Sequence, residues 1–184
     1  MIKNKSDLKY YLDSDAIALG RFYKKKSILS YIKRILFPDY IQKYQKLLRI
    51  VEYYENAQIN KIRKILIGTY YRVLLRRLSL KLGFSIPINC FGPGLSIAHI
   101  GPIIINQGTK IGSNCRIHTC VNIGTRPGYS SLAPVLGDNI YIAPGVKLWG
   151  DIHIPNNSVI GANSVVNRSF NDENTLIAGI PAKM

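Results

Sequence analysis

The sequence predicts a solenoid of short β-strands that is preceded by a group of α-helices. Large apolar residues recur every six positions from residue 91 to about residue 171, and a short fixed period of this kind marks a solenoid. The residue after each of them is often small. Residues 1–84 lack this repeat and carry apolar residues between basic ones at helical spacing.

The six-residue repeat predicts the shape of the solenoid. A period of six fits neither an amphipathic helix nor an alternating strand. It suits a coil in which each side points one aliphatic residue inward and a Gly or Asn relaxes each corner. Three sides would make a turn of about 18 residues, and stacked turns would bury a column of aliphatic side chains. The inward positions are Phe91, Ile97, Ile103, Ile111, Ile117, Ile123, Leu136, Ile142, Leu148, Ile154, Ile160 and Val166.

The N-terminal part predicts several helices. Ser6 can cap a first helix, for which Gly20 is a plausible stop. The basic segment RFYKKKSILSYIKRILF follows and ends at a proline. A further helix opens at Asp39, and the last one runs from about Asn60 to the residue before Gly83.

The positive charge is concentrated in this helical part. Of the net charge of +15, residues 1–84 contribute +13 and residues 85–184 contribute +2. We therefore divide the chain into a basic helical domain, residues 1–84, and a nearly neutral repeat domain, residues 85–184, with a loop at residues 125–135 and a C-terminal tail.

Three interpretations of the basic helices compete. They could present a solvated face that packs on a neighbour. They could dock on anionic membrane lipid or on a lipid-linked substrate. Nucleic acid is not expected as a partner, because no recognised nucleic-acid motif accompanies the charge. The cations beside aromatic residues that suit lipid are Lys24, Lys25, Lys26, Lys33, Arg34, Arg76 and Arg77.

Other features bound the kind of protein. The N-terminus MIKNKSDLKYYL has no long apolar region, so neither a signal peptide nor a membrane span is predicted. Cys90, Cys115 and Cys120 have no metal-ligand spacing, and Cys115 and Cys120 stand at repeat positions that take a small apolar residue. We therefore expect reduced packing residues in a cytosolic protein and no metal. Two departures from the period, at residues 103–110 and 125–135, predict loops.

The repeats, the segment GLSIAHIGPIIIN, the phrase IGANSVV and the terminal AGIPAK together resemble the hexapeptide-repeat acyltransferases. More narrowly they resemble the serine acetyltransferase-like branch, which includes capsule and exopolysaccharide O-acetyltransferases. The resemblance is strong over residues 85–184 and weaker before them. It implies a left-handed parallel β-helix, an exception to the usual right-handed crossover. It also implies a homotrimer with active sites between neighbouring β-helices, and acetyl-CoA as the donor.

The resemblance implies that one imidazole acts as general base on the acceptor hydroxyl. A hydroxyl attacks a thioester poorly until its proton is removed, and a histidine near neutrality serves this step well. His99 holds the position of the family's catalytic imidazole. His118, at a place usually filled by a small residue, could contact the acceptor or be structural. We assign no function to His153.

The same resemblance implies a groove for CoA along the β-helix. Backbone amides and small residues would line it, and Lys183 in the terminal PAK could meet CoA phosphates as a point charge. Tight turns explain the small residues equally well. The residues implied in the groove are Ala143, Gly145, Gly161 and Ala162.

The acceptor is not expected to be free serine. Serine acetyltransferases place an Asp beside the catalytic His, another Asp about fifteen residues before it, and an Arg-His pair in a loop. This chain has Ala98, Phe84 and the dipeptide Leu132-Ala133 there. Apolar groups would leave the charges of a zwitterion unpaired. Asp15, within DSDA, resembles the helical aspartate that reaches the substrate, and we expect it either to bind acceptor or to have a solvated or capping role.

The sequence thus predicts an acetyl-CoA-dependent O-acetyltransferase that modifies a sugar hydroxyl in surface polysaccharide biosynthesis. The acceptor could be a nucleotide sugar, a lipid-linked unit or a polymer, and the enzyme could lie at the inner face of the membrane. The alternatives are a serine O-acetyltransferase and a non-catalytic hexapeptide-repeat scaffold. A zinc enzyme of the carbonic anhydrase kind needs a set of His ligands that this chain does not reproduce.

Overall fold

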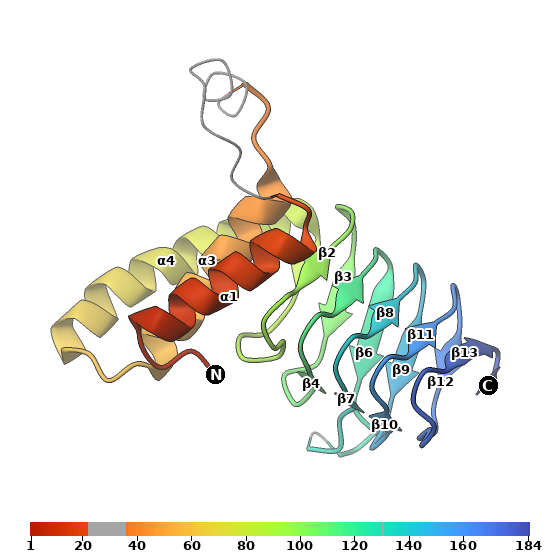
Figure 1. Cartoon of the computed structure of the whole chain (residues 1–184). Helices are drawn as coiled ribbons and strands as arrows, with labels where there is room; N and C mark the ends of the chain where they lie inside the picture. Colours follow the sequence, from red (N-terminus) through yellow and green to blue (C-terminus); the bar gives the residue numbers. More distant parts are fainter. Residues whose placement is uncertain (22–35, 130) are drawn as a thin grey trace.

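The computed structural model describes residues 1–21, 36–129 and 131–184. In these residues three α-helices precede a stack of short strands that continues to the C-terminus (Figure 1). Most of the basic segment predicted after Gly20, including Lys24, Lys25, Lys26, Lys33 and Arg34, lies outside the described residues. None of the described helices is long and apolar enough to cross a bilayer.

The helices are α1 (Lys5–Ala18), α3 (Tyr40–Asn56) and α4 (Lys61–Leu82). Asp39 caps α3 through the backbone N–H of Gln42, and Asn60 caps α4, as predicted. Gly83 ends α4 in the left-handed region, at φ 76°. The cap predicted at Ser6 is wrong. The side chain of Asn4 accepts from the N–H of Asp7 instead, so α1 begins two residues earlier than predicted.

The strands form the three sides of a β-helix. One side has the order β1-β3-β6-β9-β12, the second β10-β7-β4, and the third β14-β13-β11-β8-β5-β2. All pairings between named strands are parallel except β13 with β14. The strands are β1 Phe84–Ser85, β2 Ser96–Ile97, β3 Ile103–Ile105, β4 Lys110–Ile111, β5 Arg116–Ile117, β6 Val121–Gly124, β7 Val135–Leu136, β8 Tyr141–Ile142, β9 Lys147–Trp149, β10 His153–Ile154, β11 Val159–Ile160, β12 Val165–Val166, β13 Leu176–Gly179 and β14 Ala182–Lys183.

The core is the column predicted from the repeat. All twelve inward positions are buried, and none is more than 4% exposed. Equivalent residues stack in register from coil to coil; Ile97, Ile117, Ile142 and Ile160, for example, follow one another on the third side. Each coil therefore covers the apolar surface of the next. A single coil could not bury its own apolar side chains.

The corners explain the Gly and Asn residues of the repeat. One corner is an asparagine ladder, in which the amide of Asn114 donates to Asn139 and that of Asn139 donates to Asn157. All three have φ of 57°, in the left-handed region that Asn tolerates. At Gly112 the reason is close packing, because a Cβ there would lie 2.7 Å from the carbonyl oxygen of Gly137.

The two departures from the period are turns. In the first, the Asn106 side chain accepts from the N–H of Gly108, and the chain then enters β4. In the second, Arg126 and Tyr129 pair across a turn, with the guanidinium 5.3 Å from the ring centroid. This loop leaves the corner between β6 and β7. Cys115 is buried as expected, whereas Cys120 is not a packing residue but is exposed at a corner with φ 62°.

Candidate active site

His99 stands at the corner that follows β2, on the first coil of the third side. The N–H of Ala98 donates to the carbonyl of Ile117 at 3.0 Å, so the backbone before His99 is held by the next coil. The imidazole is exposed and has its ring contact with His118, at 5.7 Å between centroids. No hydrogen bond to the His99 ring comes from the residues that the structure describes.

His118 occupies the equivalent corner one coil further, directly after β5. Its ring is only 8% exposed and lies between His99 and Tyr141, whose ring centroid is 5.1 Å away. The Nε2 atom is buried without a hydrogen-bond partner in the described part of the chain. Burial first, and then the charges of Arg116 and His99, lower the pKa of His118 below its ordinary value of 6.5. His118 is therefore neutral near pH 7 and has an unpaired ring nitrogen beside His99.

A row of residues continues from this pair along the edge of the third side. The N–H groups of the first four residues in the row donate to the carbonyl of an aliphatic residue in the next coil, at 2.9–3.1 Å. The row consists of Ala98, His118, Ala143, Gly161 and Ala178. With strands about 4.8 Å apart, Gly161 lies about 14 Å from the first coil of the row. Small residues thus form a strip that starts at the two histidines, in which Ala143 is buried, Gly161 is half-buried and Ala178 is exposed.

The predicted CoA residues divide into two groups. Ala143 and Gly161 belong to the strip, Ala162 is exposed beside it, and Lys183 in β14 pairs with Ala178 at its far end. Gly145 has a structural explanation. Its φ is 78°, and a Cβ there would lie 2.0 Å from the Oδ1 of Asn163, so turn geometry and packing demand glycine.

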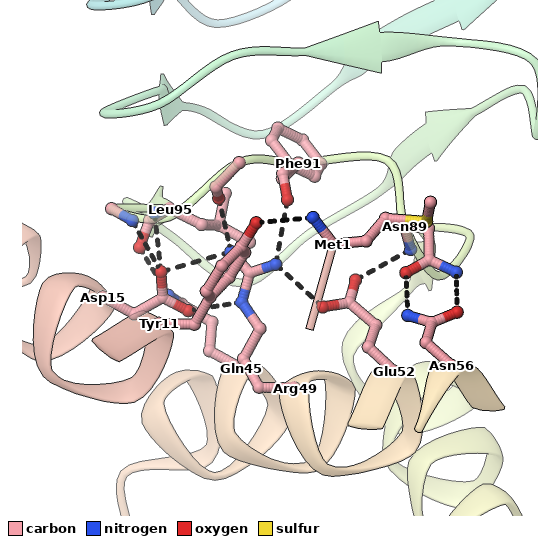
Figure 2. Close-up of polar contacts among 12 residues, drawn as sticks. Met1, Tyr11, Asp15, Gln45, Arg49, Glu52, Asn56, Asn89, Phe91 and Leu95 are labelled. Carbon is pink, nitrogen blue, oxygen red and sulfur yellow. Dashed lines mark hydrogen bonds and ion pairs between the residues drawn. The ribbon is translucent and has the colours of Figure 1, made fainter. Parts of the chain in front are cut away.

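Asp15 does not have the role expected from the sequence. It is 4% exposed, and its carboxylate accepts from Nε and Nη2 of Arg49 at 2.8 and 3.2 Å and from the backbone N–H groups of Gly94 and Leu95 at 2.9 and 2.8 Å (Figure 2). These four bonds occupy the carboxylate. We therefore correct the expected acceptor contact to a structural role, in which Asp15 ties α1 to the first coil.

The remaining residues of interest lie elsewhere. His153 is in β10, on the second side, away from the corner that carries His99 and His118. Across the three described segments, no group of three or more His, Cys, Asp or Glu side chains could hold a metal ion. Phe84, fifteen places before His99, is 3% exposed and belongs to the core, so its position could not present a side chain to a ligand.

The sequence reasoning missed Tyr141, which packs on His118. Its register partner is Arg116, 25 residues earlier, because the loop at 125–135 lengthens that coil. Counting the six-residue repeats across the loop would have placed Tyr141 in register with Arg116, next to His118.

No protein-family model matches the chain. The chain is 40% identical over 91 residues to serine acetyltransferases of Staphylococcus aureus and Staphylococcus epidermidis. The match covers 49% of this chain and 42% of those relatives, so it spans less than half the length of the curated relatives.

Solved structures match over nearly the whole chain. The soybean serine acetyltransferase apoenzyme has a TM-score of 0.73 at 20% identity, over 97% of this chain and 69% of that one. The Neisseria gonorrhoeae enzyme in complex with serine has a TM-score of 0.71 at 23% identity, over 98% and 70%. A serine acetyltransferase complex with CoA has a TM-score of 0.67 at 21% identity, over 97% and 70%. These matches confirm the left-handed β-helix with N-terminal helices, and with the sequence match they confirm the resemblance to the serine acetyltransferase-like branch.

Proposed function

We propose that this protein transfers an acetyl group from acetyl-CoA to a hydroxyl, with His99 as the general base. The observation that carries the proposal is the strip of small residues that ends at the His99–His118 pair. A long, thin thioester could lie along the strip with its carbonyl at the imidazoles. The sequence match to acetyltransferases supports the same reaction.

The reaction requires one proton to move twice. His99 takes the proton of the acceptor hydroxyl as the oxygen attacks the thioester carbonyl, and a tetrahedral oxyanion forms. The intermediate collapses, the C–S bond breaks, and the imidazolium returns the proton to the leaving thiolate. His99 is exposed at its corner, so an acceptor can reach it.

His118 would bind a reacting group through its unpaired Nε2. A buried polar atom without a partner is costly, so a ligand that supplies a hydrogen bond there gains free energy. His118 is neutral, so it can place either a donor or an acceptor at this point. Ala143, Gly161 and Ala162 would admit the donor arm, and Lys183 would meet its phosphates.

As the acceptor we propose a sugar hydroxyl in a surface polysaccharide precursor. The residue beside His99 is Ala98, and the charge of Arg116 helps to lower the pKa of His118. The carboxylate of Asp15 is occupied by Arg49 and so is not available to a substrate ammonium. This favours an acceptor that carries no ammonium group. We further propose a cytoplasmic homotrimer, whose neighbouring subunit would supply the opposite wall of a groove along the strip.

The second candidate is a serine O-acetyltransferase, as in cysteine biosynthesis. The names of the relatives favour it, and one of the similar structures is described as a complex with serine. This candidate requires that a second subunit supply the charges for the amino and carboxyl groups.

Thiol release from acetyl-CoA decides between these candidates. We expect turnover when sugars and nucleotide sugars are the acceptors and none above background with L-serine. Turnover with L-serine alone would establish the second candidate. A protein that releases no CoA with any acceptor, including lipid-linked glycans, would be a scaffold, and the proposed function would be wrong.

A further inference from the structure

The outward face of α4 carries an exposed apolar stripe. Ile62, Leu66, Val73 and Leu80 are 67%, 67%, 45% and 67% exposed. Their spacings of four, seven and seven residues place them on one side of a helix. The opposite side, with Gly68, Leu75, Leu78 and Leu82, is buried. Large apolar side chains on the free side of a helix of 22 residues indicate a binding surface.

Cations flank the stripe on both sides. By helical rotation, Arg72 and Arg76 fall on one flank and Arg63, Arg77 and Lys81 on the other. Lys61–Leu82 contains no Asp or Glu at all. Arg63, Arg76 and Arg77 form no ion pair with any residue in the described ranges, so their charge is available to a partner.

We propose that this face of α4 docks on an anionic lipid surface. An apolar stripe between two rows of cations matches the boundary of a bilayer, where side chains enter the acyl region and cations meet phosphate. The helix is about 33 Å long and would lie in the plane of the membrane. Tyr70, 61% exposed at the edge of the stripe, suits the same boundary.

A second copy of the chain is a poorer occupant. Two α4 helices packed along the stripe would bring rows of arginine and lysine together without a single acidic residue to pair them, and like charges at such flanking positions oppose association. Nucleic acid would use the cations but not the apolar row. The inference does not depend on the acceptor or on catalysis.

Co-sedimentation of the full chain with lipid vesicles tests the proposal. We expect binding to vesicles of phosphatidylglycerol and phosphatidylcholine in equal parts, and none to phosphatidylcholine alone. The double variant Leu66→Gln/Leu80→Gln should bind about tenfold more weakly or worse. Arg63→Gln and Arg77→Gln should each weaken binding about fivefold. Ile104→Gln, which removes an exposed apolar residue from β3, is the matched control and should bind as wild type.

Three results would overturn the proposal. The first is the absence of binding to the anionic vesicles. The second is unchanged binding in Leu66→Gln/Leu80→Gln, which would mean charge adsorption without an inserted stripe. The third is a smaller assembly of that variant in analytical ultracentrifugation, which would show that the stripe is covered by a second copy. Thiol release by the variants without vesicles should equal that of wild type, and this separates the surface from the active site.

Discussion

At the scale of single residues, His118 is the least ordinary feature of the site. A buried ring nitrogen without a partner is rare, because burial without a hydrogen bond costs free energy. The fold accepts this cost at the corner beside His99 and not at the equivalent corners of the next coils, which carry Ala143 and Gly161. The difference between the corners favours a role in binding.

The lowered pKa of His118 predicts how stability depends on pH. Because the folded-state pKa lies below the ordinary 6.5, the unfolded chain takes up the proton first. The contribution is fully present above about pH 6.5 and is lost as the pH falls through the folded-state pKa. In thermal melts between pH 8 and pH 5, His118→Gln should lose less stability on acidification than wild type. His153→Asn, the control, should follow the wild-type curve, and parallel curves for His118→Gln would contradict the shift.

The residues of the site were only partly predictable from the sequence. The place of His99 at a corner of the β-helix could be predicted because its motif is local and in phase with the repeat, whereas its role as general base stays a prediction. Asp15 could not be assigned correctly, because its partner Arg49 lies 34 residues away on another helix and its other partners are backbone groups of the first coil. A short acidic motif does not reveal whether its carboxylate will be buried in an ion pair with a distant cation.

At the scale of elements, a buried polar ridge on α3 joins the helices to the β-helix. Arg49 is fully buried and bonds to Asp15, to Glu52 and to the carbonyls of Phe91 and Gly92 (Figure 2). Gln45 on the same face donates to the carbonyl of Leu95 at 2.5 Å. The ridge fixes the chain that leads into β2 and so the start of the corner that carries His99.

Removal of Arg49 should therefore be costly. Arg49→Ala leaves two buried carboxylates without their cation, and we expect a loss of about 3–5 kcal/mol in the free energy of unfolding, measured in urea. Arg72→Ala breaks the exposed pair with Glu55 and is the matched control, with an expected loss of at most about 1 kcal/mol. Equal losses would mean that the ridge does not stabilise the junction.

The elements were predictable where local chemistry decides them. Asp39 and Asn60 cap the starts of α3 and α4, and Gly83 caps the end of α4. These positions could be predicted because a cap acts within a few residues. The first cap was missed because Asn4 and Ser6 are both competent, and only the geometry selects Asn4. The short strands could be predicted from the repeat because each side of a coil has one inward aliphatic residue and each corner takes a small residue or Asn. The ridge on α3 was not predicted, although Gln45, Arg49, Glu52 and Asn56 recur every three to four residues.

At the scale of the whole molecule, the stack of coils aligns residues that are far apart in the sequence. The parallel register places Ala143 and Gly161 in line with His118, although the loop between β6 and β7 separates them from it in sequence. The helices are fastened at the end of the stack where His99 stands (Figure 1). The sequence could predict the stacked column of aliphatic residues and the motif that contains His99. The exposed stripe on α4 could be recognised only once the packing of that helix was known.

Turnover of acetyl-CoA by wild type and His99→Ala, with a sugar panel and L-serine as acceptors, tests the central claim most directly. We expect His99→Ala to lower kcat by about 10²–10⁴-fold, because the hydroxyl loses its base. His153→Ala should keep wild-type turnover, and both variants should keep the sedimentation coefficient of wild type. Near-normal turnover in His99→Ala would contradict the assignment of His99 as the general base.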